Sequence, residues 1–289
     1  MRVLVTGGNA GIGYFAAEQL ASAGAEVVIG GRDPAKAEGA AASIRTQVAG
    51  ARVRHIRLDL ADLASLAPAV ESLDELDAVV CNAGVMLDAP PRRETADGHE
   101  LMFGTNHLGH FALVARLMPV LTADARIVTT GSFAAKSASL DFADLQSEHG
   151  YRPKRAYERS KLAQMLFALE LDRRLRAAGS RRLSVLAHPG GALDSLTPSR
   201  PRVHVRTAGQ WLRGLPARVV LHGKDAGARP AVRAVLGPDV AGGQLWGPRV
   251  FGLRGRPRLE PRWANLADDA AAARLWAESV TLTGLEPSA

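Results

Sequence analysis

Ser132, Tyr157 and Lys161 are residue types that can together move a proton to or from a carbonyl oxygen. Tyr157 and Lys161 stand four residues apart, a spacing that puts both side chains on one face of a helix. A nearby ammonium group stabilises phenolate, so Lys161 is expected to lower the pKa of Tyr157 toward neutrality. A tyrosine tuned in this way serves as a general acid or base, and the Ser132 hydroxyl can orient the reacting oxygen.

A second tyrosine provides a comparison within the chain. Tyr151 has Arg155 four residues later, but Pro153 between them opposes a continuous helix. A guanidinium group also does not release a proton at ordinary pH. Because a Tyr-x-x-x-Lys pair on a helix is usually a mere surface pair, the Tyr157 motif gains weight only from the motifs around it.

A glycine-rich segment near the start of the chain predicts a nucleotide site. Thr6-Gly7-x-x-x-Gly11-x-Gly13 follows a β-rich run at residues 2–6 and opens an apolar helical pattern. Glycines permit a tight turn, and the free N–H groups at a helix N-terminus attract a pyrophosphate. A strand-to-helix turn that binds no ligand can carry the same glycines. Their position directly after a strand and at the start of a helix nevertheless favours nucleotide binding.

The residues after the strand predicted at residues 26–29 indicate which nucleotide binds. Proteins of this architecture that select NAD(H) carry an acidic residue there for the ribose hydroxyls, whereas this chain has Gly30-Gly31-Arg32. Arg32 can bind a 2′-phosphate through charge-assisted hydrogen bonds. A solvated surface arginine is the alternative, but the missing acid and the cation together favour NADP(H) over NAD(H).

Two polar turns follow later strands. Asp59, in Leu58-Asp59-Leu60, would place a carboxylate beside an adenine amino group, or would serve as a turn or N-cap aspartate. The small residues of Asn82-Ala83-Gly84 let a loop pass close to a bound cofactor, and are also compatible with a plain turn.

Strands and helices alternate along the chain, and this rhythm predicts the fold. Apolar runs predict strands at residues 2–6, 26–29, 53–58, 77–81, 126–130, 183–187 and 244–246. Helical spacing predicts helices at residues 14–23, 34–48, 63–73, 98–121, 155–178, 226–236 and 268–282. Such alternation requires parallel pairing, so we predict a single α/β domain, residues 1–289. Its core would be a doubly wound parallel sheet with helices on both faces and ligands at the carboxyl ends of the strands.

The rhythm breaks at residues 193–223, which are rich in Pro and Arg and hold one short helical pattern at residues 205–215. An irregular segment of this length inside a domain is usually a functional lid or a mobile loop. We therefore predict a substrate lid after the sixth strand.

Composition excludes several classes of protein. The chain has 289 residues and 47% hydrophobic residues, enough for a sizeable core. Cys81 is its one cysteine, which excludes a disulfide framework and a Cys-rich metal site. No apolar run approaches the ~20 residues that span a bilayer. No secretory leader precedes the glycine-rich turn, so we expect a cytoplasmic protein.

The net charge of +7 raises the question of a polyanionic partner. Of the 36 cationic residues, five are lysines and the remaining 31 are arginines, which spread along the whole chain. We interpret most of them as compositional bias and as part of the surface of the lid. Nucleic-acid binding is the weaker alternative, and it predicts a steep dependence of DNA affinity on salt.

Taken together, the motifs resemble the short-chain dehydrogenase/reductase family, whose NAD(P)-binding domain has the Rossmann fold. The segment from Thr95 to Phe111, together with Arg32-Asp33 and Ser160-Lys161, is most similar to the retinol dehydrogenase-like branch. That branch commonly uses NADP(H) on lipophilic ketones, aldehydes and alcohols. The resemblance covers residues 2–190 and rests on the order and spacing of Thr6-Gly7-x-x-x-Gly11-x-Gly13, Asp59, Asn82-Ala83-Gly84, Asn106, Ser132, Tyr157-x-x-x-Lys161 and Pro189-Gly190.

This resemblance implies a role for each motif. Tyr157 would be the acid/base, Lys161 would lower its pKa and bind the nicotinamide ribose, and Ser132 would position the substrate oxygen. Asn106 would hold a water that links Lys161 to solvent. The implied cofactor-binding residues are Gly7, Asn9, Gly11, Ile12, Gly13, Arg32, Asp59, Leu60, Asn82, Ala83, Gly84, Tyr157, Lys161, Pro189 and Gly190. The substrate would lie under the lid, against Phe133, Tyr151, Trp211 and Trp246.

Two positions depart from the family pattern. Gly131-Ser132 replaces a Ser-Ser pair but keeps the second serine, which is the catalytic one in the family. A threonine that often contacts the carboxamide stands near the position of Asp194, where this chain has Asp194-Ser195. Whether either residue contacts the nicotinamide is left open by the sequence.

We therefore predict an NADP(H)-dependent ketoreductase or alcohol dehydrogenase that transfers hydride between nicotinamide and the carbonyl or alcohol carbon of a bulky hydrophobic substrate. The alternative is a non-catalytic protein of the same fold that senses NADP(H). A homodimer or homotetramer is common in the family, although a long irregular lid is equally compatible with a monomer. We expect no metal ion and interpret three histidines near the motifs as structural groups: His107, His110 and His188.

Overall fold

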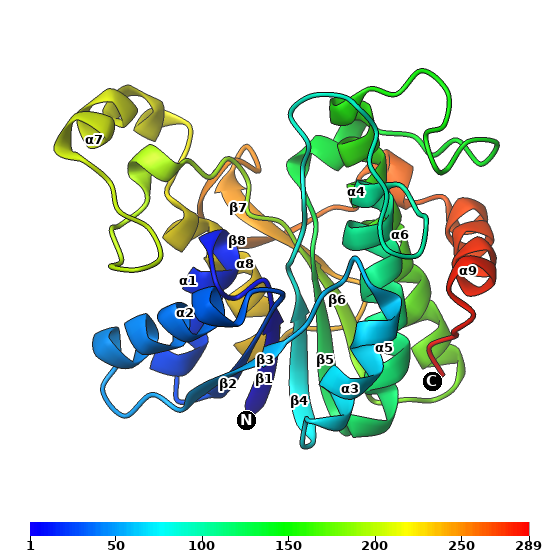
Figure 1. The fold of residues 1–289 in the computed structure, drawn as a ribbon, viewed down its shortest axis with the longest axis horizontal. Helices are drawn as coiled ribbons and strands as arrows, with labels where there is room; N and C mark the ends of the chain where they lie inside the picture. The colour runs from blue at the N-terminus through cyan, green and yellow to red at the C-terminus, as the bar shows by residue number, and fades with distance from the viewer. Residues whose placement is uncertain (289) are drawn as a thin grey trace.

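An eight-stranded sheet forms the centre of the computed structural model, which describes residues 1–288 (Figure 1). The strands lie in the order β3-β2-β1-β4-β5-β6-β7-β8, and all neighbours are parallel except β7 and β8. The predicted doubly wound α/β sheet is therefore confirmed. The strand bounds are β1 Arg2–Thr6, β2 Glu26–Gly31, β3 Val53–Arg57, β4 Leu76–Cys81, β5 Leu121–Thr130, β6 Leu183–Ala187, β7 Leu245–Val250 and β8 Arg254–Glu260.

Helices cover both faces of the sheet, because successive side chains of a buried strand point into two different cores. Val3 and Val5 of β1 pack in the core under α1, α2 and α8, whereas Leu4 between them packs in the core under α3, α5, α6 and α9 (Figure 1). The helix bounds are α1 Gly11–Ser22, α2 Pro34–Gln47, α3 Leu66–Glu71, α4 Leu101–Phe103, α5 Gly109–Leu117, α6 Pro153–Ala177, α7 Ala208–Gly214, α8 Lys224–Leu236 and α9 Asp269–Thr283.

The winding of the sheet reverses between β1 and β4. The chain adds β2 and β3 on one side of β1, and then β4 to β8 on the other. Such a reversal leaves a crevice at the carboxyl ends of the strands, where ligands bind in open α/β sheets. That edge of the sheet is marked by the last residues of five strands: Thr6, Gly31, Cys81, Thr130 and Ala187.

The helix predicted at residues 98–121 is confirmed as one helical stretch from Leu101 to Val120, but its hydrogen-bond spacing changes within it. A π-helical turn at Gly104–Leu108 separates α4 from α5, which ends at Leu117. Within this turn the Asn106 carbonyl oxygen lies 2.9 Å from His110 Nδ1, so a side chain takes part in closing the turn. Such π-helical turns are frequent at functional sites. A short 3₁₀ turn at Met118–Val120 then leads into β5, which begins earlier than the predicted strand at 126–130.

The C-terminal part of the sheet is larger than predicted. The strand expected at residues 244–246 continues to Val250 as β7, and β8 pairs with it in antiparallel direction. The sequence of β8, Arg254-Gly-Arg-Pro-Arg-Leu-Glu260, lacks the apolar alternation that marks a strand. It lies at the edge of the sheet, where Pro257 and charged side chains are tolerated.

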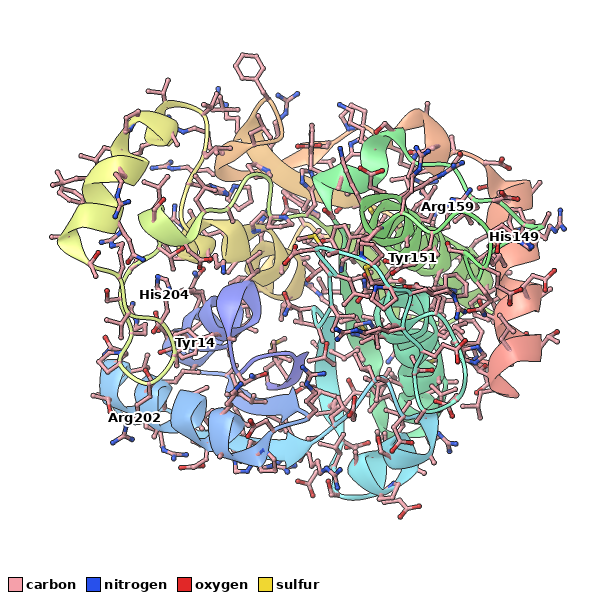
Figure 2. The ribbon with its side chains drawn as sticks, turned by 45° about the horizontal axis from the view of Figure 1, so that its top comes forward. Tyr14, His149, Tyr151, Arg159, Arg202 and His204 are labelled. Carbon is pink, nitrogen blue, oxygen red and sulfur yellow. The ribbon has the colours of Figure 1, made fainter. Side chains whose placement is uncertain are left out.

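The lid segment, residues 193–223, is irregular as predicted, but its helix α7 is shorter than expected and a 3₁₀ turn at Leu215–Val219 follows it. Arg200 fixes the first half, because its Nε and Nη2 donate to the Glu18 carboxylate of α1 at 2.6 and 2.9 Å. Figure 2 shows the loop with Arg202 and His204 beside α1 and α2. Within residues 1–288, no helix has the length and apolar character needed to cross a membrane.

Candidate active site

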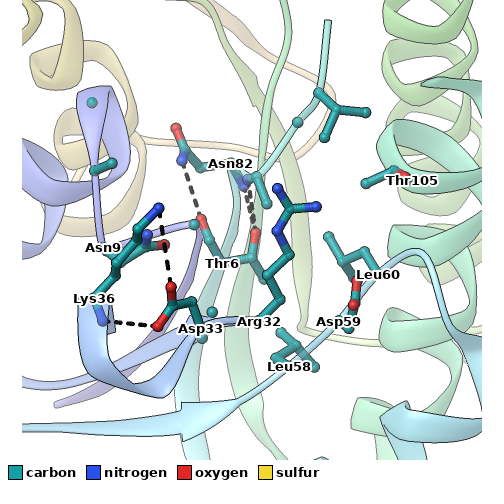
Figure 3. A pocket seen from close by; sticks show the side chains of 18 of the residues that line it. Thr6, Asn9, Arg32, Asp33, Lys36, Leu58, Asp59, Leu60, Asn82 and Thr105 are labelled. Atoms are coloured by element: carbon teal, nitrogen blue, oxygen red, sulfur yellow. Dashed lines mark hydrogen bonds and ion pairs between the residues drawn. The ribbon is translucent and has the colours of Figure 1, made fainter. Parts of the chain in front are cut away.

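A cavity of about 650 Å³ opens at the carboxyl ends of β1, β2 and β4 (Figure 3). Its volume is in the range of small-molecule and cofactor sites. The turns after these three strands and after β3 bring together most residues expected to contact the cofactor. Those that line the cavity are Gly7, Asn9, Gly11, Ile12, Arg32, Asp59, Leu60, Asn82, Ala83 and Gly84.

Two glycines let the first turn approach the turn after β4. Gly7 has a φ of +65°, and a Cβ on it would lie 2.9 Å from Ala83 Cα. A Cβ on Gly13 would overlap the Asn82 side chain and the Gly7 carbonyl oxygen. Gly13 therefore packs against Asn82 and the Gly7 carbonyl outside the cavity, whereas Gly7 and Gly11 line the cavity.

Thr6 joins the end of β1 to the end of β4. Its Oγ1 accepts the N–H groups of Asn82 and Ala83 at 2.9 and 3.0 Å, and its carbonyl oxygen accepts Asn82 Nδ2 at 3.1 Å. Asp59 stabilises the turn in which it lies, because its Oδ1 accepts the N–H of Ala61 at 3.0 Å. It also lines the cavity. Both readings of Asp59 from the sequence are thus compatible with its position.

Three cationic side chains line this cavity, and the sequence had indicated only Arg32. Arg32 is exposed and extends into the cavity (Figure 3). Lys36 lies 4.0 Å from Asp33, whose carboxylate also accepts two backbone N–H groups at the start of α2. Lys224 pairs with Asp194 at 2.5 Å. The acid next to Arg32 is therefore engaged by its own helix, and the β2 end of the cavity carries excess positive charge.

Asn106 is fully buried in the π-helical turn and holds the chain that follows β4. Its Oδ1 accepts the N–H of Val85 at 2.7 Å, and its Nδ2 donates to the Val85 carbonyl at 3.0 Å and to Ser160 Oγ at 2.9 Å. Ser160 in turn donates to the Tyr157 carbonyl at 2.8 Å. Asn106 thereby connects the rim of the cavity to the helix that carries Tyr157.

Tyr157 of α6 and Ser132 after β5 are close enough for the serine hydroxyl to affect the pKa of the phenol. Burial raises the pKa of Tyr157 above its ordinary value, and the interaction with Ser132 opposes that increase. Ser132 Oγ also accepts the N–H of Ala134 at 3.2 Å. The expected lowering of the Tyr157 pKa by Lys161 is not found in this structure, because the Lys161 ammonium donates to other groups.

Lys161 is buried beside the end of the cavity. Its Nζ donates to the Thr130 carbonyl at 3.1 Å and to Gln164 Oε1 at 2.8 Å. Burial lowers the pKa of Lys161 to about 8. A Cβ on Gly84, which lines the cavity, would lie 3.4 Å from Lys161 Nζ and 3.2 Å from Asn106 Oδ1. Lys161 and Asn106 therefore reach the same end of the cavity.

A buried chain of polar side chains continues from Lys161 to the glycine-rich turn. Gln164 Nε2 lies 3.1 Å from His110 Nδ1, and His110 Nε2 lies 2.9 Å from Thr6 Oγ1. Because the Asn106 carbonyl near Nδ1 can only accept, Nδ1 carries the proton and Nε2 accepts from the Thr6 hydroxyl. Gln164 Nε2 is also a donor, so it contacts Nδ1 without a hydrogen bond and donates to the Cys81 carbonyl at 3.3 Å. Burial lowers the pKa of His110 to about 4, which keeps its ring neutral at pH 7. We call Lys161, Gln164, His110 and Thr6 the interior polar chain.

Pro189 and Gly190 lie between the lid segment and the β7–β8 turn. The Pro189 carbonyl accepts from His222 Nε2 at 2.7 Å, which ties this turn to the end of the lid segment. A Cβ on Gly190, whose φ is +68°, would lie 2.5 Å from the Leu253 carbonyl oxygen. With Gly13, Tyr157 and Lys161, these two residues are the predicted cofactor contacts that lie outside the lining of the 650 Å³ cavity.

Two of the four aromatic side chains expected to contact the substrate have other roles. Trp246 is 6% exposed and packs in the core on the α8 face of the sheet, so its prediction as a pocket wall is wrong. The Tyr151 hydroxyl donates to Glu100 Oε1 at 3.1 Å, at the start of α4. Tyr151 precedes α6 rather than belonging to it, as Pro153 had indicated.

The other two aromatic side chains lie at the open edge of the site. Phe133, the residue after Ser132, lines a second cavity of about 600 Å³ together with Trp263 and Phe251. Trp211 is exposed on α7 of the lid segment. An aromatic surface thus begins directly beside the Ser132 hydroxyl.

Known proteins share this architecture. The family model described as short chain dehydrogenase matches residues 1–144. Polyprenol dehydrogenase of Mus musculus is 38% identical over 97% of this chain and 83% of its own length. This chain belongs to the short-chain dehydrogenase family. Retinol dehydrogenase 13 of Homo sapiens is 36% identical over 98% of this chain and 85% of its own, so this short-chain dehydrogenase lies in the retinol dehydrogenase-like branch and is an oxidoreductase.

Solved structures agree with this assignment. A crystal structure of an uncharacterized protein from Mycobacterium Paratuberculosis matches with a TM-score of 0.82 and 38% identity, covering 100% of this chain and 95% of the other. A short chain dehydrogenase from Burkholderia cenocepacia J2315 in complex with NADP matches with a TM-score of 0.59 and 25% identity, covering 81% and 89%. The second of these shows a nicotinamide cofactor bound to the same fold.

Sequence reasoning missed several residues of the site. Gln164 stands three residues after Lys161, so the helical spacing that paired Tyr157 with Lys161 also predicts this contact. Lys36 lies in the first turn of the helix that follows Arg32 and was equally open to detection. His110, which the sequence had indicated as a structural group beside Asn106, contacts Thr6. Lys224 approaches from an element far along the chain, and no local pattern marks it.

Proposed function

We propose that this short-chain dehydrogenase catalyses NADP(H)-dependent hydride transfer to or from a bulky hydrophobic carbonyl or alcohol, with Tyr157 as general acid/base. The observation that supports the proposal is the position of two pairs of polar side chains, which Ser160 connects through Asn106 and the Tyr157 carbonyl. Asn106 and Lys161 meet beside Gly84, and Ser132 interacts with Tyr157. A protein that only senses the cofactor does not need this set.

The residues around the cavity fit NADP(H). The glycine-rich turn at the N-terminus of α1 can receive a pyrophosphate, and Arg32 and Lys36 can pair with a 2′-phosphate. Asp33 is engaged with the start of α2, so it is not available to ribose hydroxyls in the way that NAD(H) selection requires. When bound, the cofactor supplies or accepts the hydride.

The residues of the protein handle the proton. In reduction, Tyr157 Oη gives its proton to the substrate oxygen, while Ser132 Oγ donates a hydrogen bond to the same oxygen. Burial favours the protonated phenol, which is the form that reduction needs. Lys161, held by Thr130 and Gln164, stabilises the phenolate that remains.

Two observations support a large apolar substrate. The 600 Å³ cavity that includes Phe133, the residue after Ser132, also has Phe251 and Trp263 in its lining. Its remaining walls include five charged side chains: Lys136, Arg249, Arg258, Glu260 and Arg262. Two similar proteins bear the names polyprenol dehydrogenase and retinol dehydrogenase 13, which point to lipophilic alcohols or aldehydes.

A turnover experiment tests the proposal. Purified protein is mixed with NADPH or NADH and a panel of hydrophobic ketones and aldehydes, and loss of reduced cofactor is followed by absorbance. We expect turnover with NADPH in preference to NADH. The substitution Tyr157→Phe should lower kcat by about 10²–10⁴-fold, since general acid catalysis contributes that much. NADPH binding by the variant should stay within a few-fold of the wild type.

Tyr151→Phe is the matched control, because it removes one hydroxyl from a tyrosine bound to Glu100. Its kcat should stay within a few-fold of the wild-type value. Full turnover by the Tyr157→Phe variant would remove Tyr157 from the mechanism. Tight NADPH binding without turnover of any substrate would favour the sensor instead.

A further inference from the structure

The positive charge of this chain is concentrated in two segments. Residues 195–223 and residues 245–259 contain nine arginines and no Asp or Glu. Because the whole chain has a net charge of +7, the remaining residues carry −2, the difference between +7 and +9. The arginines of residues 195–223 and of residues 245–259 therefore differ from the others in having no acidic residues among them.

Most of these arginines have no acidic partner. Arg200 pairs with Glu18, as described above. Within residues 1–288, the other eight lie beyond ion-pair distance of any carboxylate. Arg213, Arg218 and Arg249 are exposed to solvent. Their charges are thus free to meet an external anion.

Large apolar side chains are exposed between these arginines. Phe251, at the tip of the β7–β8 hairpin, is 83% exposed, and Val205 and Val219 of the lid segment are each 74% exposed. Trp211, Leu212 and Val250 are exposed as well. Large apolar side chains that stay exposed in this number are candidates for contact with another apolar body.

The lid segment and the hairpin form one surface. Arg254 Nη1 donates to the carbonyl oxygens of Arg218 and Val219, each at 2.7 Å. Figure 1 shows α7 and the β7–β8 hairpin at the carboxyl end of the sheet, opposite the N-terminus. We call the exposed face of α7, of the 3₁₀ turn Leu215–Val219 and of the hairpin tip Arg249–Arg256 the rim surface.

We propose that the rim surface docks this enzyme onto an anionic lipid bilayer. Arginines near such a bilayer are attracted by acidic head groups, and exposed apolar side chains enter the boundary between head groups and acyl chains. A nucleic acid would neutralise the arginines through its phosphates but would leave Phe251 and Val219 in water. The mixed cationic and apolar character of the surface therefore favours a bilayer.

Docking in this way turns the catalytic edge of the sheet toward the lipid. The rim surface flanks the Pro189-Gly190 turn, and Phe133 lines a cavity together with Phe251. A bulky apolar substrate dissolved in the bilayer then reaches the site without crossing water. This consequence rests on the proposed function, whereas docking itself does not.

Vesicle co-sedimentation tests the proposal without any turnover. Full-length protein is mixed with vesicles of phosphatidylcholine alone or of equimolar phosphatidylcholine and phosphatidylserine. We expect binding to the phosphatidylserine vesicles that weakens as salt is added, because the attraction is screened. Absence of binding to these vesicles at low salt overturns the proposal.

Two variants with equal charge change localise the binding. Arg213→Glu with Arg218→Glu should weaken binding to phosphatidylserine vesicles by about 30-fold or more, since each arginine near the surface contributes about fivefold. Arg52→Glu with Arg181→Glu changes exposed arginines at the opposite end of the sheet and should leave most of the binding. Equal loss in both double variants means that net charge alone is responsible, which overturns the assignment.

The apolar part of the surface has its own test. Phe251→Ser should weaken vesicle binding several-fold while leaving any binding to duplex DNA unchanged, because only the bilayer buries the ring. DNA binding as tight as vesicle binding, together with vesicle binding that Phe251→Ser does not alter, would assign the surface to a polyanion instead.

Discussion

The interior polar chain and the rim surface obey opposite rules. Inside, Lys161, Gln164 and His110 are buried, and each has a polar partner within hydrogen-bond distance. At the rim, Arg213 and Arg218 have no carboxylate partner among the described residues, and Phe251 lies in water. Desolvation forces buried polar groups to find partners, whereas solvent imposes no such demand on exposed ones.

This difference shows what limits the choice of residues in each region. The fold itself constrains the interior chain, because an unpaired buried group destabilises the protein. The rim is not constrained by the fold, so its uniform charge and exposed apolar groups point to something outside the molecule. The three predictions below test this comparison from its largest expected effect to its smallest.

The largest effect should come from the lysine partner in the interior chain. Gln164→Leu removes an acceptor from the buried Lys161 ammonium, and we expect kcat to fall by about 10-fold or more. Gln164→Glu places a carboxylate there, which raises the pKa of Lys161 and weakens its effect on Tyr157. The pH profile of kcat should then move to higher pH.

Gln19→Leu is the matched control, since Gln19 Nε2 donates to the Asp225 carbonyl away from the site. It should leave the pH profile of kcat in place. If Gln164→Glu also leaves that profile in place, Gln164 supports only the packing of α6.

A smaller effect concerns stability in acid. Burial lowers the pKa of His107 to about 3 and of His110 to about 4, below the value of 6.5 for an unfolded histidine. The unfolded state therefore binds more protons below pH 6.5, and stability present at pH 7 is lost as the pH falls. At pH 5 the loss should be about 2 kcal/mol for each histidine.

Urea denaturation at pH 7 and pH 5 measures this loss. His149→Gln, which removes an exposed histidine, should leave the difference between the two pH values unchanged. An equal free energy of unfolding at both pH values would mean that these rings are protonated in the folded protein.

The smallest effect separates an interior arginine from a rim arginine. Arg126 Nη1 donates to three carbonyl oxygens at the end of α8, so Arg126→Ala should lower the free energy of unfolding by about 1–3 kcal/mol. Arg218→Ala should change it by less than about 0.5 kcal/mol. A rim arginine that stabilises the fold as much as Arg126 would contradict the view that the rim serves an external partner.

Local patterns predicted much of the fold and of the site. The Tyr157 and Lys161 pair, the glycine-rich turn and Arg32 depend on spacings of a few residues, and all stand at the ends of the predicted strands or on the predicted helix. The errors arose where local pattern is weak. β8 has no apolar alternation, and Trp246, predicted in a strand and as a wall of the substrate site, packs in the core under α8.

The sequence by itself determined the element order, the nucleotide-binding turn and the tyrosine–lysine pair, because short-range geometry decides them. Only the tertiary structure decided that Lys161 reaches Thr6 through Gln164 and His110, since strand order brings together residues far apart in the chain. It also decided that the turn holding Arg218 lies against the β7–β8 hairpin, where Arg254 donates to the Arg218 and Val219 carbonyls. The sequence lists the charged residues, but only the fold determines which of them lie on the same face of the protein.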